Sequence, residues 1–278
     1  MKIKYGVNKR DLDKYNTSEL RDEFLISNIF EVNKINLTYS HIDRIIFGGV
    51  IPLDSVNLDV IDCNKSLGSS YFLENREMGI INIGGKGNIL VDNIKYEIDN
   101  MEALYISKGS KNIIFNSNNK ESLSKFYIVS TVAHKEYETK LIKKEMVTKV
   151  ELGDKSNCNE RIIYKYFNPD VVNTSSLLMG LTMLKDGSIW NTMPAHTHDR
   201  RMEVYMYFNV DCENVVFHLM GEPKNTKHLV VKNEECVISP SYSIHSGVGT
   251  KNYNFIWAMT GENKNYDDMN SIEIKDLL

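Results

Sequence analysis

From Asn36 onward, the chain is a succession of short segments with the composition of β-strands. They are rich in Ile, Val, Tyr and Phe, and clusters of Gly, Asn, Asp and Lys separate them. Short strands at regular spacing are typical of a sandwich or barrel and not of a sheet built from β-α-β units. The sequence therefore predicts an all-β fold. The segments are INLTYSHI, RIIFGGVI, MGIINI, NILVD, ALYIS, NIIF and KFYIVS in the first half, and SSLLMGLTML, IWNTM, EVYMYF, NVVFHLM, HLVVK, CVIS and YNFIW in the second.

Few helices are expected beside these strands. One is predicted over residues 17–30, where Leu20, Phe24 and Leu25 have helical spacing. A polar stretch over residues 151–160 (ELGDKSNCNE) is the best candidate linker. A chain of 278 residues exceeds the common domain size. We therefore predict two domains, 1–150 and 151–278.

The two halves of the chain are weakly similar to each other. Arg76-Glu77 opens an apolar run as Arg201-Met202-Glu203 does, and EALYIS (102–107) resembles ECVIS (235–239). If this similarity is a repeat, the chain contains two stacked β-barrels of common ancestry. Only the second barrel carries histidines in a ligand-like pattern, so the first is expected to be metal-free.

Charge and composition exclude several classes of protein. The net charge of -4 and a pI near 6.0, with no basic block, argue against binding to nucleic acid. No apolar run approaches the roughly 18 residues of a membrane span, and no secretory signal opens the chain. The four cysteines lack the spacing of a zinc ribbon or a disulfide framework. These features predict a cytoplasmic protein with reduced thiols and no membrane partner.

Three histidines and one glutamate form a pattern suited to a metal. Residues two apart on a strand point to the same side, so His196 and His198 can both face inward. Glu203 has the wrong parity for a continuous strand, and a turn or bulge before it would return its carboxylate to the same side. His245 follows the turn at Pro240 and would come from another strand. The four side chains are therefore predicted metal ligands.

The ligand set leaves the metal open. Imidazole and carboxylate together suit zinc, iron, manganese or nickel. A His-x-His pair by itself is more often a pair of surface or core histidines, and Glu203 and His245 are what favour the metal.

The same residues resemble the two motifs of the cupin superfamily. His196-x-His198-x4-Glu203 looks like the first motif, and Pro240-x4-His245 looks like the second. The resemblance implies a cupin-type double β-barrel, similar to a bicupin, with its metal site in the C-terminal barrel alone. The chain departs from the motifs at turn positions, where the family usually has glycine at Tyr242 and near Val210, and asparagine at Gly249.

A closer resemblance extends over nearly the whole chain, to the 5-keto-4-deoxyuronate isomerase family. It implies an intramolecular oxidoreductase that converts 5-dehydro-4-deoxy-D-glucuronate to 3-deoxy-D-glycero-2,5-hexodiulosonate in pectin and uronate degradation. It also implies zinc, one ion per subunit, bound by His196, His198, Glu203 and His245, and a homohexamer. The segments that carry it are YSHIDRIIFGG (39–49), LGSSYFLENREMGIINIGGKG (67–87), NTMPAHTHDRRMEVYMYFN (191–209), ISPSYSIHSGVGTK (238–251) and GENKNYDDM (261–269).

Residues for the reaction itself are harder to identify from sequence. Tyr205 and Tyr207 share a strand face with Glu203, so their hydroxyl groups could reach the pocket, although buried tyrosines bonded to backbone are more common. Arg161, Arg200 and Arg201 could bind a substrate carboxylate, although surface arginines are the default. The catalytic base stays unassigned. His41 and Glu74 lie in matching segments without a role that their local sequence names.

Two other functions remain open at this point. Three histidines and a glutamate also suit an iron-dependent oxygenase of cupin type. A non-catalytic cupin that binds a sugar acid is the third hypothesis, and it lacks the output module that a regulator would need.

Overall fold

A computed structural model describes residues 1–278, and in it the chain forms two compact units. Unit 1 comprises Met1–Lys4, Asn28–Thr148 and Tyr166–Leu178, and unit 2 comprises Tyr5–Ser27, Lys149–Lys165 and Met179–Leu278. Segments 5–27 and 166–178 therefore lie with the unit that the other half of the chain forms, across the predicted boundary at residue 150. That the units are separate domains, with a metal in the second alone, stays a prediction.

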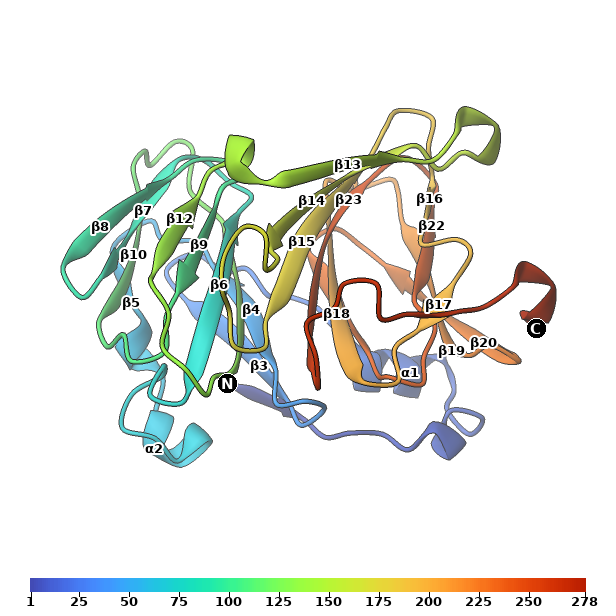
Figure 1. Cartoon of the computed structure of the whole chain (residues 1–278), viewed down its shortest axis with the longest axis horizontal. Helices are drawn as coiled ribbons and strands as arrows, with labels where there is room; N and C mark the ends of the chain where they lie inside the picture. The colour runs from blue at the N-terminus through green and yellow to red at the C-terminus, as the bar shows by residue number, and fades with distance from the viewer. The chain divides into compact units, whose positions relative to one another are not determined.

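Unit 1 contains a seven-stranded sheet and a four-stranded sheet (Figure 1). Apolar side chains fill its core, among them Met78 and Ile80 from the first sheet and Ile89 and Phe115 from the second. The larger sheet has the order β1 (Lys2–Lys4), β3 (Ile35–Ser40), β4 (Ile46–Val50), β11 (Phe126–Val132), β6 (Arg76–Asn82), β9 (Ala103–Ile106) and β12 (Lys140–Ile142). The smaller has the order β5 (Val56–Asn57), β10 (Ile113–Ser117), β7 (Gly87–Val91) and β8 (Ile94–Ile98).

Unit 2 repeats this arrangement and adds a short ribbon. Its larger sheet has the order β13 (Thr148–Leu152), β14 (Arg161–Phe167), β15 (Leu178–Leu184), β23 (Asn254–Gly261), β18 (Arg201–Phe208), β21 (Glu235–Ser239) and β2 (Leu25–Ile26). Its smaller sheet has the order β16 (Trp190–Asn191), β22 (Ser246–Gly249), β19 (Val216–Glu222) and β20 (Asn225–Val231). The ribbon pairs β17 (His196–Thr197) with β24 (Asn270–Ser271).

The sheet orders agree with the weak repeat in the sequence. Strands β11, β6 and β9 hold the same places in unit 1 as β23, β18 and β21 hold in unit 2. Arg76 and Arg201 open the equivalent strands β6 and β18, and the two similar EALYIS and ECVIS segments form β9 and β21. In both units the paired sheets resemble the two sheets of a jelly roll, and no ladder of hydrogen bonds closes them into a barrel.

Helices are few and short, as predicted. They are α1 (Thr17–Phe24), α2 (Cys63–Leu67) and five single 3-10 turns. Helix α1 starts where expected, because Asn16 and Glu19 form a capping box. It ends six residues before the predicted residue 30, because Leu25 and Ile26 pair with β21 instead of extending the helix. None of the helices has both the length and the apolar character that a membrane crossing requires.

Candidate metal centre and pocket

Four side chains converge at one end of a pocket in unit 2. His196 belongs to β17, His198 follows it, Glu203 belongs to β18 and His245 directly precedes β22. A turn at Asp199 and Arg200 separates β17 from β18, and it brings Glu203 beside the two histidines as the sequence predicts. One ligand atom from each of the four lies within 4.8 Å of the others.

The four ligand atoms form a ring of short separations. His196 Nε2 is 3.2 Å from His198 Nε2 and 2.9 Å from His245 Nε2. Glu203 Oε2 is 3.1 Å from His198 Nε2 and 3.0 Å from His245 Nε2. Four side chains, two from strands and two from loops, thus direct their donor atoms at one point, as the ligands of a single cation do.

The protonation states of the cluster also suit a cation. Burial, with the neighbouring imidazoles, lowers the pKa of His196 to about 2, so its ring is neutral and keeps a free lone pair. Burial opposes ionisation of Glu203, but His245 and His198 outweigh it and hold the pKa of this carboxyl below its usual range. The cluster therefore offers neutral imidazole and an anionic carboxylate.

A second layer of contacts orients the imidazoles. His198 Nδ1 lies 3.0 Å from the carbonyl oxygen of Asp268, and His245 Nδ1 lies 3.3 Å from Ser239 Oγ. These contacts leave both Nε2 atoms directed at the cluster, the arrangement seen around many metal-binding histidines. His196 is held through the backbone, because it pairs with Ser271 of β24.

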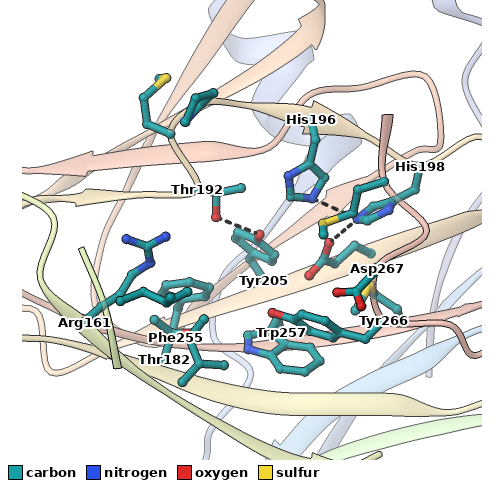
Figure 2. A pocket seen from close by; sticks show the side chains of 17 residues that line it. Arg161, Thr182, Thr192, His196, His198, Tyr205, Phe255, Trp257, Tyr266 and Asp267 are labelled. Atoms are coloured by element: carbon teal, nitrogen blue, oxygen red, sulfur yellow. Dashed lines mark hydrogen bonds and ion pairs between the residues drawn. The ribbon is translucent and has the colours of Figure 1, made fainter. Parts of the chain in front are cut away.

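The pocket has a volume of about 340 Å³ and lies over the larger sheet of unit 2. Figure 2 shows Arg161 on the side opposite His196 and His198, with Tyr205 between them. The remaining walls are mostly apolar and aromatic, and they come from β13, β14, β15, β23 and the loops before β17 and β24. The lining residues are Leu152, Arg161, Ile163, Thr182, Thr192, Met193, Pro194, His196, His198, Glu203, Tyr205, Phe255, Trp257, Met259, Tyr266, Asp267 and Met269.

The predicted tyrosines lie on one face of β18 but at different depths. Tyr205 lines the pocket, and its hydroxyl group is 3.4 Å from Thr192 Oγ1. Its ring packs edge-on against His245, with 5.4 Å between the ring centroids. Tyr207 lies deeper and forms a 2.7 Å hydrogen bond with His218 Nδ1. Burial raises the pKa of both tyrosines well above the usual value, so both hydroxyl groups stay protonated.

The three candidate arginines have different surroundings. Arg161 lines the pocket and donates to the carbonyl of Asn159, and no carboxylate forms an ion pair with it. Arg200 is exposed and pairs with Asp268. Arg201 is buried, and its guanidinium group donates to the carbonyls of Asn265, Tyr266 and Asp268. Arg161 is thus the candidate whose charge faces the pocket, while Arg201 holds the 265–268 loop.

Several pocket residues were not predicted as site residues. Phe255, Trp257 and Met259 are spaced two residues apart along β23, so their side chains share one face of the strand. This spacing could have predicted from the sequence that the three lie together. Tyr266 and Asp267 lie in a loop, where no periodicity exists, although the resemblance covers their segment. His41 and Glu74 belong to unit 1 and do not line this pocket.

Comparison with known proteins gives closely related sequences. A model of the KduI/IolB family matches residues 29–276. A protein of Lachnoclostridium phytofermentans named 4-deoxy-L-threo-5-hexosulose-uronate ketol-isomerase is 51% identical over 278 residues, which cover 100% of both chains. A protein of the same name from Escherichia coli (strain SMS-3-5 / SECEC) is 50% identical over 277 residues, again with 100% of both chains covered.

Solved structures with a similar fold are more distant in sequence. An IolB-like protein from Salmonella typhimurium LT2 has a TM-score of 0.68 at 15% identity and covers 90% of this chain and 96% of its own. The oxalate decarboxylase of Bacillus subtilis, described with Mn(II) centres, has a TM-score of 0.56 at 8% identity and covers 84% of this chain and 72% of its own. These likenesses concern the fold, and they confirm the predicted all-β, cupin-type architecture.

Proposed function

The chain belongs to the KduI/IolB family, and from this premise we propose that it is a metal-dependent ketol-isomerase of a 4-deoxy-5-keto uronate. In this reaction an aldehyde sugar acid becomes its 2-keto isomer, 3-deoxy-D-glycero-2,5-hexodiulosonate. The observation that carries the proposal is the pocket itself. A cluster of metal-ligand type lies at one end, and a guanidinium group without an acidic partner lies at the other.

His196, His198, Glu203 and His245 would hold the cation. Their donor atoms are separated by 2.9 to 3.2 Å around the cluster, a spacing that suits the ligands of one divalent cation. A divalent cation there would polarise the carbonyl and hydroxyl oxygens of the sugar. We propose zinc, one ion per subunit, and the ligands also accept iron, manganese or nickel.

Arg161 would bind the carboxylate of the substrate. The isomerisation changes the two carbons at the aldehyde end, and the carboxylate is at the other end of the six-carbon chain. A cationic group across the pocket from the cation cluster suits this separation, and guanidinium matches a carboxylate through two parallel hydrogen bonds. Burial lowers the pKa of Arg161, yet the group stays charged near neutral pH.

Asp267 is our candidate for the proton transfer. It lines the pocket and is the carboxylate there outside the cation cluster. The carboxylate of its neighbour Asp268 pairs with Arg200 and accepts a hydrogen bond from Asn263, whereas Asp267 forms no ion pair. Its carboxylate would take the proton from the hydroxyl-bearing carbon and return it to the former aldehyde carbon through an enediol, while the proton of the substrate hydroxyl moves to the former aldehyde oxygen. The hydroxyl groups of Tyr205 and Thr192 can donate to the substrate oxygens, and Phe255 and Trp257 exclude water.

The decisive experiment follows the conversion of 5-keto-4-deoxyuronate by NMR, with and without chelation and zinc readdition. We expect chelation to abolish turnover and zinc to restore it. His196→Ala combined with His198→Ala should lower turnover by roughly 10³-fold or more. Asp267→Asn should keep the metal, as measured by elemental analysis, and lose about 10²- to 10⁴-fold in turnover.

Three outcomes would overturn the proposal. Full turnover by the double histidine variant in verified metal-free form would remove the cation from the reaction. Absence of turnover in every metal state, with oxygen uptake on a sugar or aromatic substrate, would favour the oxygenase. Tight binding of a uronate without turnover would instead favour a binding protein.

The resemblance to the family supports three further proposals. We propose a role in pectin and uronate breakdown, a location in the cytoplasm and a homohexamer. Sedimentation velocity of the purified protein measures the last of these directly.

A further inference from the structure

Tyr266 forms part of the pocket wall and is contacted on its ring by two other side chains. Lys165 Nζ lies 3.6 Å from the centroid of the Tyr266 ring. The ring of Trp257 lies 5.4 Å away between centroids, tilted by 55°. Tyr266 and Trp257 both line the pocket, whereas Lys165 does not. The lysine therefore reaches the pocket only through the aromatic ring.

The segment that carries Tyr266 contains no regular strand between the end of β23 at Gly261 and the start of β24 at Asn270. Arg201 fixes its backbone by donating to three of its carbonyls. Those bonds hold the main chain and leave the direction of the Tyr266 ring undetermined. The direction of the ring depends on what packs on it, and the ammonium group of Lys165 lies directly over its face.

Lys165 is placed for this contact by the pleat of β14. It lies two and four residues after Ile163 and Arg161, which both line the pocket, so all three side chains share one face of the strand. No acidic side chain forms an ion pair with Lys165, so its charge is directed at the π face of Tyr266. A lysine ammonium group within 6 Å of an aromatic face is attracted by the quadrupole of the ring.

We propose that Lys165 is a positioning residue that holds the Tyr266 ring against the pocket and thereby sets how tightly the sugar acid binds. The inference deepens the proposed function and rests on it for its kinetic part. Lys165 touches no reacting atom, so its removal should weaken substrate binding and leave the chemical step nearly unchanged.

The kinetic test compares variants that keep or remove the cation. Lys165→Met keeps the length of the stem and removes the charge, and we expect KM to rise about 3- to 10-fold with kcat nearly unchanged. Lys165→Arg keeps the cation and should restore KM to within about twofold of the wild type. Lys165→Gln also removes the charge but keeps a polar side chain, and it should behave as Lys165→Met. Agreement between the two variants would show that the rise in KM comes from the lost charge and not from a folding defect of one substitution. Lys149→Met is the matched control, because Lys149 pairs with Glu151 and does not line the pocket.

A double variant separates action through the ring from direct attraction of the anionic substrate. In a Tyr266→Leu background, Lys165→Met should leave KM unchanged, because the ring through which the lysine acts is gone. A further rise in KM of the same size in that background would overturn the proposal. So would a fall in kcat at constant KM.

A spectroscopic measurement needs no substrate, so it tests the position of the ring even if the proposed reaction is wrong. The two tryptophans, Trp190 and Trp257, both lie in unit 2, and Trp257 contacts Tyr266. Lys165→Met should change the near-ultraviolet circular dichroism of the free protein, and Lys165→Arg should not. Identical spectra for wild type and Lys165→Met would show that the lysine does not position the ring.

Discussion

His218 lies on β19 behind Tyr205, with its whole side chain buried. Its Nδ1 bonds to the hydroxyl group of Tyr207, while its Nε2 has no hydrogen-bond partner. Its ring packs edge-on against Tyr205, with 5.6 Å between centroids. Burial, with a contribution from His245, lowers the pKa of His218 to about 3. The folded protein therefore keeps this imidazole neutral at pH values where an exposed histidine is charged.

This burial predicts a dependence of stability on pH. Above the unfolded pKa near 6.5, both states carry a neutral His218, and the residue adds no pH dependence. Between about pH 6.5 and 3, His218 binds a proton in the unfolded chain but stays neutral in the folded protein. The free energy of unfolding should then fall by about 1.4 kcal/mol per pH unit on acidification from this residue alone.

The measurement is urea unfolding of the chelated protein between pH 4 and 7, for wild type and His218→Gln. The variant should show a shallower slope by about 1.4 kcal/mol per pH unit. His196 is present in both proteins, so its contribution cancels. His228→Gln, at an exposed position, is the control for loss of a histidine. Equal slopes for wild type and His218→Gln would contradict the prediction.

At the scale of elements, the close packing of β15 against β23 positions the pocket wall. Gly180 belongs to β15, and a Cβ atom placed on it would lie 2.1 Å from Trp257 Cζ2 and 2.5 Å from the carbonyl oxygen of Tyr164. Only a residue without a side chain leaves room for the Trp257 ring at this site. The strand pair therefore fixes where that ring lies over the sheet.

Gly180→Ala should displace Trp257 and disturb the pocket. We expect the free energy of unfolding to fall by about 1 to 3 kcal/mol because of overpacking. Turnover should fall roughly 10-fold or more, because the displaced ring no longer shapes the substrate site. Gly79→Ala is the control, since Gly79 of β6 in unit 1 is also crowded, against Leu177 and Phe167, and does not touch the pocket. Wild-type kinetics for Gly180→Ala would refute this account.

At the scale of the whole molecule, the two units exchange segments along the chain. The segment Tyr5–Ser27 belongs to unit 2, although most of the sequence around it forms unit 1. It is anchored by the pairing of β2 with β21, by Arg21 Nη1 donating to the carbonyl of Val230, and by the buried Phe24. The unit that carries the candidate metal centre is therefore complete only with residues from the start of the chain.

Phe24→Ala should destabilise unit 2, although Phe24 lies near the start of the sequence. Loss of a fully buried phenylalanine costs about 3 to 5 kcal/mol. Because both tryptophans lie in unit 2, their fluorescence during denaturant unfolding measures this unit. Phe47→Ala makes the same truncation in the core of unit 1 and tests whether the two units unfold together. A tryptophan transition that Phe24→Ala leaves in place would show that the N-terminal segment does not support unit 2.

The sequence by itself determined the short strands, the all-β class, the start of α1 and the four residues of the metal-type cluster. The strands, the helix start and the grouping of His196, His198 and Glu203 depend on local rules, namely the period of two along a strand, the capping box and the spacing of residues around a turn. His245 lies far from them in sequence and was identified by its resemblance to the second cupin motif. Alternation on β18 was also sufficient to place Tyr205 and Tyr207 on the face of Glu203.

Only the tertiary structure decided the remaining features of the site. Leu25 and Ile26 leave the helical pattern because pairing with β21 outweighs local propensity. Arg161, Trp257 and Tyr266 line one pocket, and Lys165 contacts the ring of Tyr266, because β14, β23 and the 262–269 loop come together. No local sequence pattern encodes these contacts. The assignment of segments 5–27 and 166–178 to their units has the same cause. Contacts between residues far apart in sequence depend on which surfaces bury each other, and this is a property of the folded chain as a whole.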